Sequence, residues 1–337
     1  MNLISKSVYI RPENARIYAG IFFSSFMYIA CTAPQTNQLQ VEKPHDLPEQ
    51  AIISNVPFFP QEQFHCGPAT LAMAMNHYNI EITPKELAKD VFTPNLKGSL
   101  QVEMKAASRQ QGMLAYELTP KLVYLLAEVS VGHPVIVLQN LAIKVYPVWH
   151  YALVIGYDLN SKIIILHTGL NEKYEISMKT FEHTWNRGNN WALVVLPSDR
   201  LPNDHNQKNI LQAAVDLEQV GKIENANEAY KAISNRWPNN YVAVMGLANT
   251  YLRLNEPHKA TENYLRATKI KPRQADVYNN LAYSLHAQAC ANASLQSIQC
   301  AIMLEPDNLE FQDSLKEISH LKTETTEQSC PEVVCPK

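Results

Sequence analysis

The sequence predicts an α+β domain over residues 51–200, followed by an all-α domain over residues 207–322. The first is predicted because helical patterns come before runs that are dense in Val, Ile, Leu and aromatic residues. The second is predicted because prolines at positions 238, 272 and 306 recur at a spacing of 34 residues, which is typical of helical repeats. A chain of 337 residues has room for roughly two such domains.

The amino-terminal end has the pattern of a secretory signal. Basic residues precede an uncharged, mostly apolar run of 14 residues from Ile17 to Ala30, and Cys31 follows directly. A membrane-spanning helix needs about 20 apolar residues, so the run is short for a span. The pattern therefore predicts a signal over residues 1–31.

The segment "MYIAC" at residues 27–31 resembles a bacterial lipobox. The resemblance implies that Cys31 is lipidated and becomes the mature amino terminus, and Thr32 is similar to the outer-membrane sorting pattern. A lipoprotein of the bacterial cell envelope, in the outer membrane and facing the periplasm, is the expectation. An uncleaved anchor and a plain secretory signal are the alternatives. Residues 32–50 contain few large apolar side chains and are expected to form a linker.

The elements of the first domain follow from local patterns. Pro68 suits the first turn of a helix that begins at Cys66, and Thr83 with Glu86 forms a capping-box pattern. Further helices are expected over residues 99–112 and 120–130. Strands are expected over residues 135–141, 150–158, 162–168 and 191–197.

Cys66 and His150 are the candidate catalytic pair. A cysteine at a helix amino terminus lies where the dipole and the free amides favour the thiolate, which is the nucleophilic form. A nucleophilic cysteine needs a base, and His150 opens a strongly apolar strand at a sheet edge. The alternative bases are His65, His77, His133, His167 and His183.

The segments "PQEQFHCGPATLAMAMNHY", "GHPVIVLQN" and "HYALVIGYD" together resemble papain-fold cysteine peptidases related to the bacteriocin-processing, double-glycine leader peptidases. The resemblance implies a papain-like fold, with Cys66 as the nucleophile and His150 as the base. It also implies that Gln61 donates to the oxyanion, together with the Cys66 backbone N–H. Gln63 is the competing glutamine.

The third catalytic position departs from the pattern of that family, which has an aspartate or asparagine there. The matching position falls on His167, with Asn171 as an alternative, while Asp158 lies at the wrong end of its strand. An imidazole does not stabilise an imidazolium as a carboxylate does. Two hypotheses follow: a membrane-tethered cysteine peptidase that cleaves an exported peptide or protein, or a weakened peptidase-like interaction scaffold.

The 34-residue spacing resembles tetratricopeptide repeats and predicts three helical hairpins plus a capping helix. The predicted packing positions of successive repeats are Ala214, Ala248 and Ala282; Ala226, Ala260 and Ser294; Tyr230, Tyr264 and Ile298; and Ile233, Ala267 and Ala301. Such arrays bind peptides or proteins, so a protein partner is expected here as well as a protein or peptide substrate.

Composition excludes other classes of function. A net charge of −3 without a basic cluster argues against nucleic-acid binding. Metal-binding spacings such as CxxC or HExxH are absent, so neither a metal nor a cofactor is expected. Cys330 and Cys335 could bridge within a tail over residues 323–337 that is expected to be flexible, and Cys290 and Cys300 lie in a helical region.

Overall fold

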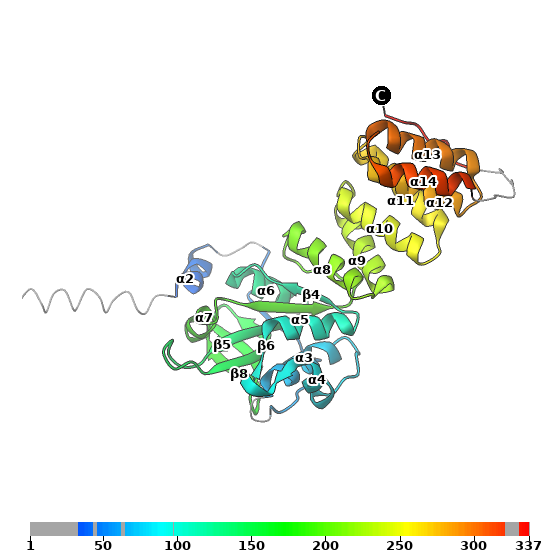
Figure 1. Ribbon diagram of the computed structural model, residues 1–337. Helices are drawn as coiled ribbons and strands as arrows, with labels where there is room; N and C mark the ends of the chain where they lie inside the picture. Colours follow the sequence, from blue (N-terminus) through cyan, green and yellow to red (C-terminus); the bar gives the residue numbers. More distant parts are fainter. Residues whose placement is uncertain (1–32, 43–45, 62–64, 97, 321–329, 337) are drawn as a thin grey trace, which may run out of the picture.

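The computed structural model describes residues 33–42, 46–61, 65–96, 98–320 and 330–336. The predicted signal with Cys31, and the competing Gln63, lie outside the described residues. Figure 1 shows a sheet with its helices, and an array of helices that leads away from it to the carboxyl terminus. None of the helices in the described ranges has both the length and the apolar composition of a membrane span.

An antiparallel sheet forms the centre of the first domain, with strand order β4-β9-β5-β6-β7-β8 and β1 beside β6. Its strands are β1 (Gln50–Ile52), β4 (Leu114–Glu117), β5 (Val135–Asn140), β6 (Trp149–Asp158), β7 (Ile163–Thr168), β8 (Asn171–Ser177) and β9 (Ala192–Leu196). Short strands β2 (Phe92–Thr93) and β3 (Gly98–Ser99) pair separately around the 3-10 turn Pro94–Leu96. The predicted order, helices followed by a sheet, is confirmed.

The helices of this domain are α3 (Cys66–Asn76), α4 (Pro84–Val91), α5 (Gln101–Gln110), α6 (Leu122–Ser130) and α7 (Met178–Asn186). Helix α3 is buried on all sides from Gly67 to Met75, as its apolar composition requires, and it packs on β5, β6 and β7. The predicted capping box is confirmed at the start of α4, where Thr83 and Glu86 bond reciprocally. Strands β4 and β8 and helix α7 were not predicted from the sequence.

Part of the expected linker is a docked helix instead. Helix α2 (Pro34–Val41) packs against α6 and α7 and buries Leu39. Glu182 of α7 accepts hydrogen bonds from the Gln35 and Thr36 backbone amides at 3.0 and 2.7 Å, so its carboxylate satisfies free N–H groups at the start of α2. The linker prediction was wrong for these residues because it considered only their own apolar content and not a buried carboxylate supplied by α7.

Within residues 207–320, three helical hairpins and a final helix follow, as the repeat spacing predicts: α8 (Gln207–Gln219) with α9 (Ile223–Arg236), α10 (Tyr241–Arg253) with α11 (Pro257–Ile270), α12 (Ala275–His286) with α13 (Ala291–Leu304), and then α14 (Leu309–His320). All twelve predicted packing positions are at least 98% buried. Small side chains such as Ala248 and Ala260 let paired helices approach closely, so the 34-residue pattern describes a real repeat core.

The first repeat shares its hydrophobic core with the sheet domain. Ile210, Leu217 and Ile233 belong to the same buried cluster as the strands, whereas the later repeats form a second cluster. Polar contacts strengthen this junction: Arg109 pairs with Asp216, and Arg236 donates to the Pro202 carbonyl at 2.6 Å. Residues 197–206 connect the two predicted domains, which share one continuous apolar core.

The carboxyl-terminal segment is held by two disulfides. Cys330 pairs with Cys290 and Cys335 pairs with Cys300, so Cys330 and Cys335 do not bridge to each other. Val333, between them, is 1% exposed in the core of the last repeats. The expectation of a flexible tail is therefore wrong for residues 330–336, because both cysteines have partners on the last repeat that lie 40 and 35 residues away.

We expect reduction of these disulfides to destabilise the last repeats, because each bridge closes a long loop and is worth about 3–4 kcal/mol in the chain-entropy model. Urea unfolding followed by circular dichroism, with and without reductant, measures the change in the free energy of unfolding. The double variant Cys330→Ser/Cys335→Ser should reproduce the effect of reductant, and Cys66→Ser is the matched control. An unchanged unfolding midpoint in both experiments would contradict the prediction.

Candidate active site

Cys66 is the first residue of α3, and its neighbour Gly67 allows the helix start to approach β3 closely. A Cβ atom at Gly67 would lie 2.6 Å from the Cβ of Ser99, which is closer than real side chains pack. Cys66 is half-buried and is the free cysteine among the residues that the structure describes. The local sequence thus places one thiol at a crowded but partly open helix terminus.

Burial raises the pKa of the Cys66 thiol above its ordinary value. Hydrogen bonding to the backbone of Tyr151, Gly67 and Cys66 itself lowers the pKa, but burial outweighs this effect. The Thr70 hydroxyl of α3 lies 3.4 Å from the Tyr151 carbonyl oxygen of β6, one residue after His150. The helix that begins at Cys66 therefore packs against the strand that carries the predicted base.

His150 is the second residue of β6 and lies opposite Gln139 of β5. Its Nε2 atom lies 2.7 Å from the Thr168 hydroxyl oxygen at the end of β7. Burial lowers the pKa of His150 below its ordinary value, so the ring is neutral at pH 7. The preceding Trp149 is 53% exposed, so this end of β6 lies at the protein surface.

Thr168, rather than His167, is the residue that the structure brings to His150. The pairing of β6 with β7 shifts register between Val154 and Gly156, so that Leu153 pairs with His167, and the His167 ring is fully buried. There its two nitrogens meet the Val56 carbonyl at 3.3 Å and the Lys173 N–H at 3.1 Å. The prediction of His167 as the third catalytic residue assumed regular pairing, and the irregularity turns the next side chain toward the base.

Gln61 lies close to the start of α3 but is bound within the protein. Its Nε2 donates to the Thr70 hydroxyl at 3.2 Å, and its Oε1 accepts from the Gly169 N–H at 3.1 Å. Thr70 in turn donates to the Cys66 carbonyl at 2.6 Å. Gln61 therefore links the Cys66 helix to the loop that follows Thr168, and its second Nε2 hydrogen is not used in these contacts.

The other candidate residues have different surroundings. His77 contacts the Gly132 carbonyl, His133 pairs with Glu128, and His65 packs edge-on against Phe92. His183 lies on α7, and Asn171, the alternative third residue, is exposed at the start of β8. Asp158 accepts backbone hydrogen bonds in the β6–β7 turn, at the far end of the strand from His150, as expected.

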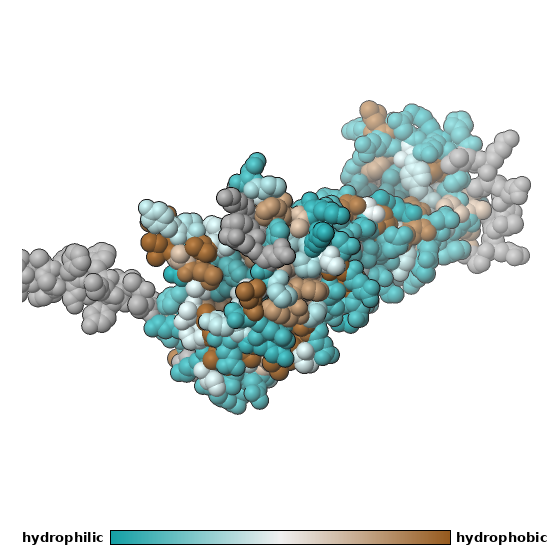
Figure 2. Space-filling model, turned by 90° about the horizontal axis from the view of Figure 1, so that it is seen from below, coloured by the Kyte–Doolittle hydropathy of each residue, from teal (hydrophilic) through white to brown (hydrophobic). Residues whose placement is uncertain are grey.

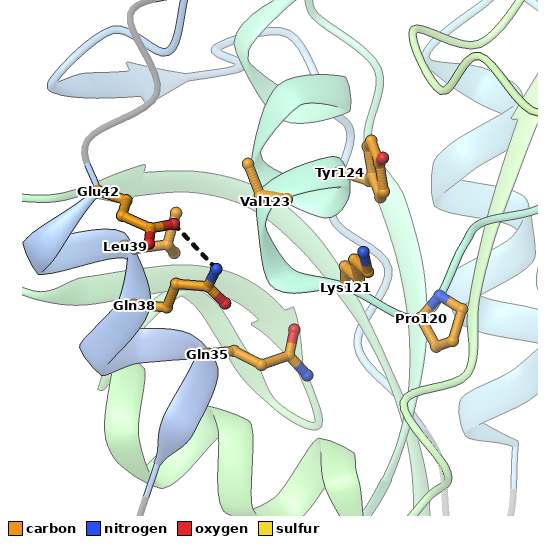
Figure 3. Close-up of a pocket in the computed structure, with 8 residues that line it drawn as sticks. All are labelled: Gln35, Gln38, Leu39, Glu42, Pro120, Lys121, Val123 and Tyr124. Atoms are coloured by element: carbon orange, nitrogen blue, oxygen red, sulfur yellow. Dashed lines mark hydrogen bonds between the residues drawn. The ribbon is translucent and has the colours of Figure 1, made fainter.

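The described residues place neither a metal cluster nor the cavity between α2 and α6 at this site. Within the described ranges, no group of three or more His, Cys, Asp or Glu side chains is arranged to hold a metal ion. A cavity of about 510 Å³ lies between α2 and α6, where Gln38 is bonded to Glu42 (Figure 3). Its lining residues lie in or beside α2 and the start of α6, so this cavity is separate from the junction of α3, β6 and β7.

One family model matches most of the sheet domain. Residues 53–192 match the model described as "Peptidase_C39 like family". The matched region contains Gln61, Cys66, His150 and Thr168. Among curated proteins, none matches the chain.

Solved structures resemble both parts of the chain at low identity. A putative C39-like peptidase from Bacillus anthracis is 19% identical, with a TM-score of 0.37, and the alignment covers 44% of this chain and 98% of that one. The first TPR domain of Spaghetti (RPAP3), bound to an HSP90 peptide, is 20% identical, with a TM-score of 0.33 over 34% of this chain and 90% of that one. The TPR domain of Arabidopsis OM64 is 15% identical, with a TM-score of 0.33 over 34% and 96%.

Proposed function

Because residues 53–192 form a Peptidase_C39-like domain and tetratricopeptide repeats follow it, we propose that the protein is a cysteine peptidase that cleaves an exported peptide or protein. The observation that carries the proposal is the geometry around β6. The helix that begins at Cys66 packs against β6, where Thr70 contacts the Tyr151 carbonyl. The neighbouring His150 is held by Thr168. A thiol and an imidazole supplied by distant segments meet the basic requirement for nucleophilic catalysis.

In the proposed reaction, Nδ1 of His150 takes the Cys66 proton as the sulfur attacks the substrate carbonyl carbon. The Cys66 backbone N–H and the second Nε2 hydrogen of Gln61 donate to the oxyanion that forms. Collapse of this intermediate breaks the C–N bond, and the imidazolium passes its proton to the leaving amine. Water, deprotonated by the same imidazole, then hydrolyses the thioester and restores the thiol.

The pKa shifts support proton transfer during the reaction rather than a preformed ion pair. Burial raises the pKa of Cys66 and lowers that of His150, so a neutral thiol beside a neutral imidazole is the favoured resting state. Thr168 holds the ring by a hydrogen bond but supplies no negative charge. His150 is therefore a competent general base at neutral pH, and its protonated form lacks the stabilisation that a carboxylate would add.

The remaining parts of the proposal concern location and partners. The signal and lipobox patterns support lipidation at Cys31 and tethering in the bacterial envelope, on the periplasmic face of the outer membrane. The two disulfides support an oxidising compartment. The repeats would recruit the substrate or a second protein, because stacked helical hairpins present extended binding surfaces.

A second function, a peptidase-like interaction scaffold, is favoured by the same neutral site. A raised thiol pKa and a neutral third residue are what a domain with weakened catalysis would retain. The two functions differ in whether the reactivity of the Cys66 thiol depends on the peptide and on His150.

Peptidyl vinyl sulfones test the choice between them. For a peptidase, we expect Cys66 of the full chain to be labelled at a rate that saturates with reagent concentration, depends on the peptide and falls sharply in His150→Ala. Mass mapping identifies the labelled thiol. A slow labelling rate that is the same for different peptides and for His150→Ala, as for an ordinary thiol, would exclude the enzyme and favour the scaffold.

A further inference from the structure

The β5–β6 connection projects an unusual number of apolar side chains into solvent. Leu141, Ile143, Val145, Tyr146, Val148 and Trp149 are each between 50% and 76% exposed. We call residues 141–149 the apolar hairpin. Figure 2 shows hydrophobic side chains gathered at the left edge of the molecule in that view. Apolar patches of this kind mark contacts with a protein or a membrane.

Hydrogen bonds define the backbone conformation of the apolar hairpin. Leu141 donates its backbone N–H to the Val148 carbonyl at 2.9 Å, and Tyr146 donates to Ile143 at 3.2 Å. At the base, the Asn140 side chain accepts from the Ala142 and Val148 amides at 3.1 and 3.0 Å. These bonds hold the backbone in one shape, so the apolar side chains face outward as a set.

The first described residues, at the start of α2, lie on the same side of the domain as this hairpin (Figure 1). Ala33 is 2% exposed, and Glu182 binds the start of α2, so the first described residues are held against the domain. Cys31 precedes Ala33 by two residues in the sequence, and two residues of chain span at most about 7 Å. A lipid attached at Cys31 would therefore hold this edge of the domain directly against the membrane.

Helix α7 connects the two features. Glu182 binds the start of α2, and Arg187, five residues later, donates to the Asn140 carbonyl at 3.0 Å. Five helical residues extend about 7.5 Å, so the chain exit and the base of the hairpin lie on the same edge of the domain. Figure 1 shows α2, α7 and the adjoining end of β5 on that side.

We propose that the apolar hairpin inserts into the lipid surface beside the amino-terminal anchor; this inference rests on the membrane tethering proposed above. Aliphatic side chains with Tyr146 and Trp149 match the membrane interface, where aromatic rings with a polar group collect. Lys144 is the single charged residue of the hairpin and reaches the headgroups. Two contacts fix the orientation of the domain, whereas a tether alone does not.

The proposal narrows the substrate class. Trp149 immediately precedes His150, so insertion of the hairpin brings the candidate active site to the membrane surface. The substrates are then polypeptide segments that emerge from the bilayer or lie along it, rather than peptides free in solution.

Fluorescence quenching tests the contact. The lipidated full chain is reconstituted in vesicles of phosphatidylethanolamine and phosphatidylglycerol, with or without brominated acyl chains. We expect brominated lipid to quench part of the tryptophan emission, because Trp149 is exposed whereas Trp185 and Trp191 are buried. Trp149→Phe should remove that quenching, and Trp237→Phe, a matched change in the first repeat, should leave it.

Vesicle flotation separates the failure of the hairpin from the failure of the tether. Flotation with equal emission in both lipids overturns the hairpin contact and leaves the tether standing. Failure to float with vesicles overturns both. Neither readout depends on catalysis, so both stand apart from the peptidase proposal.

The double variant Val145→Asp/Tyr146→Ser provides a functional readout. We expect it to cleave soluble peptides at the parent rate but a membrane-tethered peptide about tenfold more slowly, because orientation raises the effective concentration at the surface. An equal loss on both substrates would instead assign the hairpin to peptide binding and overturn the membrane contact.

Discussion

Replacing Cys66 with alanine will abolish peptide cleavage by the full chain, and replacing His150 with alanine will lower it about 10²- to 10⁴-fold. The first change removes the nucleophile, and the second removes the base that must take its proton, because the Cys66 pKa is raised above the ordinary thiol value. Cleavage of a fluorogenic peptide library, with products identified by mass spectrometry, measures both effects.

The matched control is His183→Ala, which removes an imidazole from α7. Near-parent activity is expected for it. Thermal unfolding of each variant separates a catalytic loss from a folding loss. Undiminished cleavage by Cys66→Ala would assign any observed activity to another residue or to a contaminant.

The pH dependence belongs to the same prediction. Since burial lowers the pKa of His150, the neutral base persists below pH 6.5, and activity should fall only as the pH drops through that lowered value. Since the pKa of Cys66 is raised, no alkaline fall is expected up to about pH 9. A bell-shaped profile centred near pH 6 would indicate a preformed ion pair and contradict this resting state.

Thr168→Asp is expected to convert the neutral pair into a thiolate–imidazolium pair. The aspartate carboxyl group would take the place of the hydroxyl oxygen, which lies 2.7 Å from Nε2, and its negative charge would favour the charged ring. The charged ring would in turn favour the thiolate. The iodoacetamide alkylation rate of Cys66 at pH 6 should rise about tenfold or more as a result.

Thr168→Val is the matched variant, because it keeps the branched shape and removes the hydroxyl. We expect it to lower peptide cleavage without raising alkylation at pH 6, since the ring loses its orienting bond and gains no charge. If Thr168→Asp and Thr168→Val gave the same alkylation profile, then Thr168 would have no electrostatic influence on the pair.

Sequence patterns were sufficient where one local rule decides the structure. The Thr83–Glu86 capping box begins a helix in the sequence and in the structure. Prolines spaced by 34 residues imply small residues where helices cross, and Ala248 and Ala282 are fully buried there. These features depend on neighbours within one or two turns or on a fixed period, so a single sequence is enough to find them.

Features that depend on distant partners were not predictable in the same way. The turn of Thr168 toward His150 follows from a register shift between β6 and β7 near Gly156, which an assumption of regular strand pairing misses. The docking of α2 requires Glu182, which lies 146 residues after Thr36. Likewise, no spacing rule says which of four cysteines will pair.

The apolar core shared by the sheet domain and the first repeat has a mechanical consequence. A hinge between two modules needs a connection that can flex without exposing buried side chains, and this junction offers none across Ile210 and Leu217. The first repeat therefore has a fixed orientation relative to the sheet domain. If the repeats bind a partner as proposed, each repeat would present it to Cys66 from one direction and at one distance.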